Sequence, residues 1–192
     1  MPESCPTKRT FSSKRLKRWW LPAPIALAYL YICTDKENWG VAMSYTVESI
    51  LSDEALISNY PWNRDSLFAF GAALAEHGRA KKLPLAIAIY LEDVKIFQTF
   101  LEGTNATNEI WIGRKINTVR ATGHSTLHLR ATMEPEPYAK LGLEHHLGEL
   151  AVCGGGVPIH KDGKVFAVII VSGLPHVDDH TTIVETFKAF AK

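Results

Sequence analysis

Residues 154–175 read GGGVPIHKDGKVFAVIIVSGLP. Two apolar runs, 157–160 and 165–172, flank the pair Asp162-Gly163, and Asp-Gly between two apolar runs is a strong signal of a β-hairpin. The second run lacks the alternation of polar and apolar residues that a half-buried strand shows, so it should be buried on both faces. The stretch therefore predicts a hairpin in the middle of a sheet, entered through three glycines.

The rest of the chain supplies helices and one more hairpin. A Pro84–Tyr90 strand is followed by a Glu92-Asp93 turn and a returning strand over 94–100, and apolar residues at helical spacing predict four helices, over about 46–58, 65–82 and 108–122 and from Asp178 or Asp179 onward. Residues 133–150 read as a loop with short helical pieces. Because two hairpins cannot form a parallel sheet through short connections, we expect an α+β fold. We predict a three-layer α/β/α sandwich around a mostly antiparallel sheet of four to five strands.

The triple glycine does not fit either phosphate-binding pattern. A dinucleotide fingerprint needs a third glycine at position 159, which is Ile, and a Walker loop needs Gly five residues before Gly163, where Pro158 stands. Two interpretations remain. Glycines before a strand let two backbones approach closely, whereas exposed glycine amides form a nest for an anionic ligand.

The first 42 residues differ from the rest in charge and composition. They hold seven Lys/Arg against three Asp/Glu, a net charge of +4, although the whole chain of 192 residues has a net charge of +1. An uncharged run from Trp19 to Cys33 is shorter than a membrane span and contains Pro22 and Pro24. We expect residues 1–42 to be a basic and apolar extension, either disordered or a targeting segment, and residues 43–192 to form one domain.

Charge and cysteine content limit the partners and the compartment. The near-neutral domain has no basic patch interleaved with aromatic residues, so we expect no nucleic-acid partner, and membrane contact only through residues 1–42. The three cysteines are odd in number and lack C-x-x-C spacing, and we expect Cys153 to be a free thiol. We expect a cytoplasmic protein, with a membrane-anchored, secretory or mitochondrial location as alternatives that depend on the extension.

Four short motifs carry a resemblance to a known family: NEIWIGRK (108–115), GHST (123–126), GGGVPI (154–159) and VSGLPHVDDH (171–180). Together they resemble the heme-degrading-domain family, related to GlcG/HbpS-like proteins and to the C-terminal domain of PduO-type proteins, over about residues 46–192. The resemblance implies an α/β/α sandwich and homo-oligomers, often rings. It also implies heme or corrinoid binding in some relatives, and delivery of tail-anchored membrane proteins for one yeast relative.

The chain departs from that family at positions near the glycines. Leu150 and Cys153 stand where the family has Tyr and His, Ser125-Thr126 replaces Ser-Ser, and Val157 replaces Phe. The chain therefore lacks two polar groups near any pocket at the glycines. We expect the ligand between the helix over 108–122 and the glycine loop, near His180. The candidate ligand-binding residues are Arg114, Lys115, Ser125, Gly154, Gly155, Gly156, Ser172 and His180.

Two histidine pairs, His124/His128 and His176/His180, have the i, i+4 spacing that can chelate a metal on a helix. Both lie at expected helix ends, where capping or solvation explains them, so we predict no metal site. Two functions stay open. One is a homo-oligomer that binds a small ligand, heme or a related tetrapyrrole, with heme degradation as an activity that the resemblance implies. The other is a non-enzymatic oligomeric adaptor.

Overall fold

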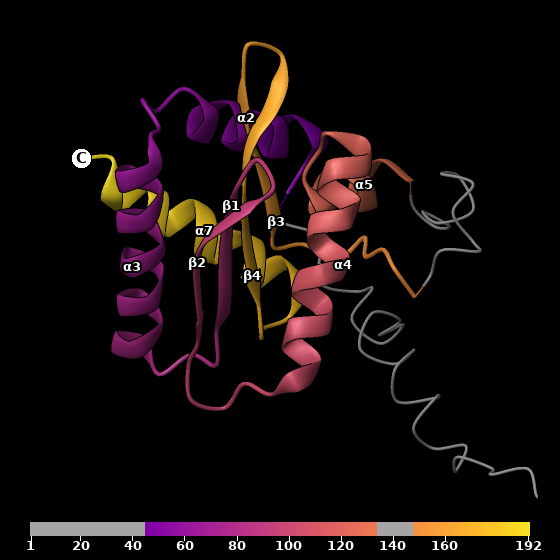
Figure 1. The fold of residues 1–192 in the computed structure, drawn as a ribbon. Helices are drawn as coiled ribbons and strands as arrows, with labels where there is room; N and C mark the ends of the chain where they lie inside the picture. The colour runs from indigo at the N-terminus through magenta and orange to yellow at the C-terminus, as the bar shows by residue number, and fades with distance from the viewer. Residues whose placement is uncertain (1–44, 134–147) are drawn as a thin grey trace, which may run out of the picture. The chain divides into compact units, whose positions relative to one another are not determined.

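A computed structural model describes residues 45–133 and 148–192 (Figure 1). In chain order the elements are α2 (Val47–Ser58), α3 (Arg64–Lys81), β1 (Ala86–Leu91), β2 (Val94–Phe100), α4 (Ala106–Thr122), α5 (Thr126–Met133), β3 (Gly156–Lys161), β4 (Lys164–Ser172) and α7 (His176–Phe190). The four strands of these residues form one sheet in the order β2-β1-β4-β3, and every neighbouring pair is antiparallel. The predicted α+β class and antiparallel sheet are confirmed.

Strand β4 lies at the centre of the sheet, as the apolar run predicts. Residues 167–172 are all buried, and successive side chains point to opposite faces. Ile169 and Val171 pack into a core with α2, α3 and α7, whereas Val168 and Ile170 pack against α4. Helices therefore cover both faces of the sheet, which explains why this strand carries no polar alternation.

Helix starts differ from the prediction where a cap lies upstream of the apolar pattern. Asn63 caps α3, because its side chain accepts a hydrogen bond from Ser66 N while Ser66 Oγ accepts one from Asn63 N. The helix therefore begins at Arg64, close to the expected start at residue 65. Helix α4 likewise begins at Ala106, after its cap Asn105.

Helix α7 begins at His176 and not at Asp178 or Asp179. The Pro175 carbonyl accepts hydrogen bonds from the backbone N–H groups of Asp178 and Asp179, which closes the first turn earlier than the acidic pair suggests. His180 therefore lies in the second turn of the helix, on its buried side, and not at the helix start.

Helix α5 was not predicted. Its start is fixed by Ser125, whose hydroxyl oxygen accepts a hydrogen bond from His128 N at 3.1 Å. Most of the predicted loop over 133–150 and all of the extension over 1–42 lie outside the described residues. None of the helices within 45–133 and 148–192 combines the length and apolar character that crossing a bilayer requires.

Candidate functional site

The glycine loop is packed against three other elements. Gly154, Gly155 and Gly156 are all buried. A Cβ on Gly154 would collide with the carbonyl oxygen of His176, and Gly155 has a φ of +104°, a region that favours glycine. This arrangement is the one that close backbone approach predicts, because atoms of β4, α4 and α7 occupy the space beside the first two glycines.

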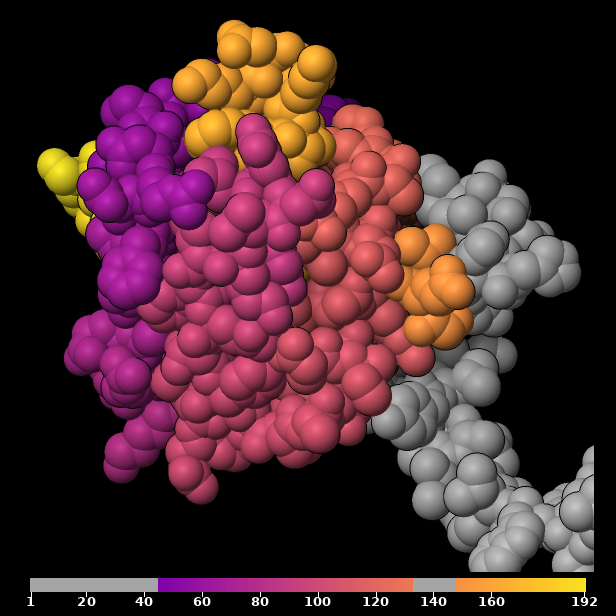
Figure 2. Space-filling view, viewed as in Figure 1, coloured from indigo at the N-terminus to yellow at the C-terminus, as the bar shows by residue number. Residues whose placement is uncertain are grey.

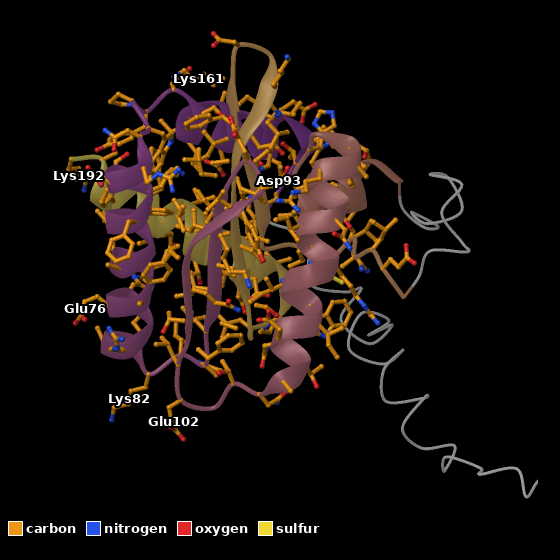
Figure 3. All side chains as sticks on the ribbon, in the orientation of Figure 1. Glu76, Lys82, Asp93, Glu102, Lys161 and Lys192 are labelled. Carbon is orange, nitrogen blue, oxygen red and sulfur yellow. The ribbon has the colours of Figure 1, made fainter. Side chains whose placement is uncertain are left out.

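A buried ion pair lies directly beside this loop. Lys115 Nζ is 2.8 Å from Asp179 Oδ2 and also donates a 2.8 Å hydrogen bond to the Val171 carbonyl. The side chains of Lys115 and Asp179 are each 3% exposed, unlike charged residues such as Glu76 and Lys82, which project outward at the periphery (Figure 3). The pair joins the middle of α4 to the end of β4 and the first turns of α7.

Both carboxylate oxygens of Asp179 are engaged. Oδ1 accepts a 2.9 Å hydrogen bond from Leu174 N, in the turn between β4 and α7. Burial raises the pKa of Asp179, and the Lys115 ammonium and the hydrogen bonds to the carboxylate oppose that rise. Asp179 therefore fixes the turn before α7 from inside the helix, although the sequence placed the helix start at Asp178 or Asp179.

Arg114 points away from the glycine loop. Its Nε donates to the Gly148 carbonyl at 3.0 Å, and its guanidinium carbon lies 5.0 Å from the centre of the Trp111 ring. Arg114 and Lys115 thus lie in different surroundings, because adjacent residues point about 100° apart around a helix. The structure brings Lys115, the glycines and His180 together, and it places Arg114 elsewhere.

His180 and His176 lie on α7 next to the glycine loop. His180 is 0% exposed, and within the described part of the chain neither of its ring nitrogens has a hydrogen-bond partner; the same holds for Nδ1 of the partly buried His176. Burial lowers the pKa of His180 to about 4, with Asp53 raising it and Lys115 lowering it further. Burial, followed by the cations Arg130 and Lys115, lowers the pKa of His176 to about 4. Both imidazoles are therefore neutral at pH 7.

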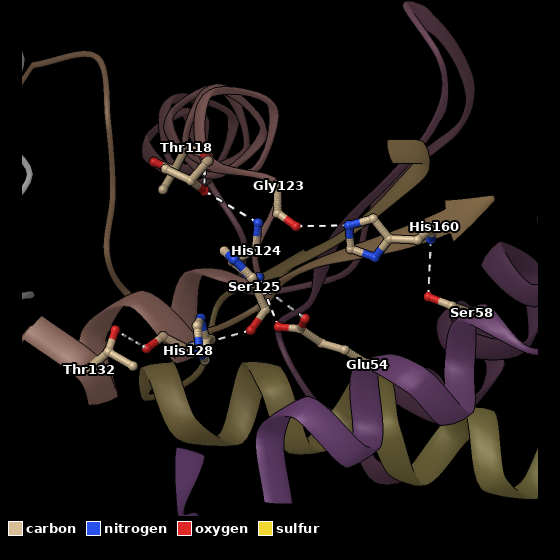
Figure 4. A network of polar contacts seen from close by, with 10 residues as sticks. Glu54, Ser58, Thr118, Gly123, His124, Ser125, His128, Thr132 and His160 are labelled. Atoms are coloured by element: carbon tan, nitrogen blue, oxygen red, sulfur yellow. Dashed lines mark hydrogen bonds and ion pairs between the residues drawn. The ribbon is translucent and has the colours of Figure 1, made fainter. Parts of the chain in front are cut away.

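Ser125 belongs to a neighbouring polar network that also contains Glu54 of α2 (Figure 4). Glu54 Oε1 accepts a 2.9 Å hydrogen bond from Ser125 N, and Thr126 Oγ1 accepts a 3.0 Å bond from Gly156 N. Ser125 thus caps α5 and links it to α2. Sequence reasoning missed Glu54, although its position four residues after the buried Ile50 puts it on the inner face of α2.

The remaining candidates, Ser172 and the pair His124/His128, contact other parts of the protein. Ser172 is buried at the end of β4, opposite Ala86 of β1. The His124 and His128 rings lie 4.5 Å apart, and His124 Nδ1 is 4.0 Å from Glu54 Oε2. Across the described ranges, no three His, Cys, Asp or Glu side chains are arranged to hold a metal ion.

Cys153 is buried and disulfide-bonded, so the expectation of a free thiol is wrong.

Fold and site together define an antiparallel α+β domain with shielded, neutral imidazoles beside a closely packed glycine loop. The family model described as "Haem degrading protein HbpS-like" matches residues 63–188. The chain therefore belongs to the HbpS-like haem-degrading family, and the resemblance carried by the four motifs is confirmed.

Individual relatives agree with this assignment. A UPF0303 protein of Mesorhizobium japonicum is 34% identical over 120 residues, covering 62% of this chain and 72% of that protein. The crystal structure of the Ybr137w protein is similar with a TM-score of 0.69 and 25% identity, covering 77% of this chain and 88% of that one. HbpS itself (TM-score 0.54, 16% identity, 68% and 90% covered) and a PduOC:heme complex (0.52, 17%, 65% and 94%) share the fold.

The two depressed histidine pKa values predict a loss of folding stability in acid. Because the unfolded imidazole binds a proton near pH 6.5 and folded His180 only near pH 4, stability is fully present above pH 6.5, falls as the pH drops through this window and levels off below it. The difference of about 2.5 corresponds to about 3 kcal/mol for His180 alone. Urea unfolding at several pH values measures this fall.

The matched variants are His180→Phe and Ile183→Val. His180→Phe removes the titrating imidazole, so the free energy of unfolding should depend less steeply on pH between 6.5 and 4, by a slope of up to one bound proton. Ile183→Val changes a buried apolar residue of the same helix, removes no titratable group and should leave the slope unchanged. Equal slopes in wild type and His180→Phe would show that His180 is not the titrating group.

Proposed function

We propose that this protein binds heme or a related tetrapyrrole as a homo-oligomer, and that His176 and His180 form the part of the site nearest the metal. The observation that carries the proposal is the pair of neutral imidazoles with unpartnered ring nitrogens in the described residues. A neutral imidazole nitrogen is a common axial ligand of heme iron. The family description and the heme in the PduOC neighbour support this ligand class.

The positive charges near the two imidazoles also suit a tetrapyrrole ligand. Arg130 and Lys115 both act on His176 electrostatically, and a cation beside an imidazole suits the acidic side chains of a tetrapyrrole. Lys115 is paired with Asp179, so its charge is already compensated. His176 is partly exposed and His180 is enclosed, so the ligand meets His176 first.

Heme supplies redox chemistry when it is bound, and the chain supplies its environment. The shielding that lowers the pKa of His180 also keeps water away from that imidazole. Arg114, which was among the expected contacts, has its Nε on the Gly148 carbonyl and does not belong to this proposed site. Heme degradation, which the family description names, is included in the proposal as a second property to be measured.

Hemin titration of the full chain tests binding. We expect a saturable shift of the Soret band, and a loss of affinity of at least about tenfold in His176→Ala, because that variant removes one of the two proposed metal ligands. His124→Ala is the matched control for a histidine outside the cluster and should bind like wild type. Loss of the Soret band under a reductant measures degradation separately.

A shift that His176→Ala and His180→Ala both leave unchanged would contradict the proposed ligands. If hemin produces no saturable shift at all, the non-enzymatic adaptor is favoured. A specific observation supports that second function: Lys115 is paired internally, His180 is fully buried and protein atoms fill the space beside Gly154 and Gly155. In that case the cluster stabilises the fold, and the outer surface carries the function.

A further inference from the structure

The two edges of the sheet differ in how their backbone groups are satisfied. On β3, Gly156 N donates to Thr126 Oγ1 and His160 N donates to Ser58 Oγ, each at 3.0 Å. Pro158, between them on the same side of the strand, has no N–H to donate. Figure 4 shows the contact between His160 and Ser58. Side chains of α5 and α2 thus close this edge to a further strand.

Among residues 45–133 and 148–192 the edge formed by β2 is open. No side chain of these residues donates to or accepts from the outer backbone groups of this strand. Its ends carry two exposed apolar side chains, Val94 at 52% and Phe100 at 42%. In Figure 2 the β1–β2 hairpin forms part of the molecular surface between α3 and α4. The pairing of β2 with β1 has one register irregularity, at Ile96, and the remaining outer backbone groups of the strand are a template for pairing with another strand.

The charge on β2 does not oppose such pairing. Lys95 is its single charged residue, and Lys95 Nζ lies 2.7 Å from Gln98 Oε1 and 3.5 Å from Glu109 Oε1 of α4. This charge is therefore compensated on the α4 side of the sheet. A further exposed apolar residue, Phe68 of α3, lies beside the strand, and its ring packs on Phe97.

We propose that β2 is the surface through which two copies of this chain associate, by antiparallel pairing of β2 with β2 about a two-fold axis. A head-to-tail arrangement would need the β3 edge as the partner, and the hydroxyl contacts of Thr126 and Ser58 together with Pro158 block it. The sheet can therefore be extended only by pairing β2 of one copy with β2 of another. This isologous contact uses the same edge of both copies, so the assembly formed by it closes after two copies. This inference rests on the homo-oligomer in the proposed function and names its interface.

Sedimentation of the full chain tests the pairing. The wild-type mass should be at least twice the monomer mass of 21.4 kDa. The double variant Val94→Asp/Phe100→Asp should lower that mass twofold, because like charges on paired edges repel. The control Leu51→Asp/Leu56→Asp changes two α2 residues of similar exposure, 40% and 44%, and should keep the wild-type mass.

Three results would overturn the interface: a monomeric wild type, a β2 variant that retains the wild-type mass, or an equal drop in both variants. Circular dichroism establishes that each variant is folded, and Phe100→Lys gives the same readout if the double variant unfolds. Hemin titration of the β2 variant separates the two proposals. Unchanged heme binding in a dissociated protein would leave the ligand proposal standing, whatever the interface.

Discussion

Replacing Gly155 by alanine is expected to destabilise the domain by about 4 kcal/mol. The φ of +104° is unfavourable for any L-residue with a side chain, and a Cβ at this position would meet the Val171 carbonyl oxygen, Asp179 Cβ at 2.7 Å and Lys115 Nζ at 2.8 Å. The ion pair cannot move aside cheaply, because both partners are buried and bonded to the backbone.

Chemical denaturation at pH 7.5 measures this effect, with Gly113→Ala as the matched control. Gly113 lies in α4, and apart from the adjacent backbone of that helix no atom of the described residues lies within 4 Å of the Cβ that alanine would add. That variant should be unchanged or more stable by up to about 1 kcal/mol, because alanine favours a helix. Similar free energies of unfolding for the two variants would mean that the glycine loop is not closely packed.

Lys115→Met is expected to cost about 3 to 5 kcal/mol of folding free energy, because it leaves the Asp179 carboxylate buried without its cation. The deficit relative to wild type at the same pH should shrink as the pH falls. Without Lys115 the folded-state pKa of Asp179 rises further above its unfolded value, so the folded variant takes up this proton before the unfolded chain does, and the carboxyl group destabilises it less in acid. Unfolding of the variant and of wild type at pH 7.5 and at pH 5 measures this difference.

The double variant Lys115→Met/Asp179→Asn provides the control. Asparagine keeps an oxygen acceptor for Leu174 N but carries no charge. We therefore expect the double variant to be more stable than Lys115→Met alone, and the two changes to be strongly non-additive. If Asp179→Asn added its full cost to that of Lys115→Met, the two side chains would not be acting as a pair.

Local chemistry explains which parts of the fold were predictable. The β3–β4 turn was found from two residues, and the structure gives Asp162 and Gly163 φ values of 53° and 74°, as a type I′ turn requires. Helix α5 was not predicted because it has only eight residues and its start depends on one serine. The start of α7 was placed late because Asp178 and Asp179 resemble caps, whereas Asp179 bonds to a lysine of another helix.

Some members of the candidate site were predictable, but Arg114 was expected there and instead bonds to Gly148, and the contacts within the site were not predictable. Motif resemblance placed Lys115, the glycines and His180 in one region, and the structure brings them together. The partner of Lys115 is 64 residues away and could not be read from local spacing. Glu54 belongs to no recognised motif. It was not predicted as part of the site because a single glutamate on an amphipathic helix normally faces solvent.

The ion pair between Lys115 and Asp179 also has a consequence for kinetics. Its two residues are separated by 64 positions, and its third partner, Val171, lies at the end of the central strand. The chain must close this long loop before the contact forms, so we expect the contact to be largely absent from the folding transition state. The contact then acts mainly by slowing unfolding. It therefore affects the lifetime of the folded domain more than it affects the rate of folding.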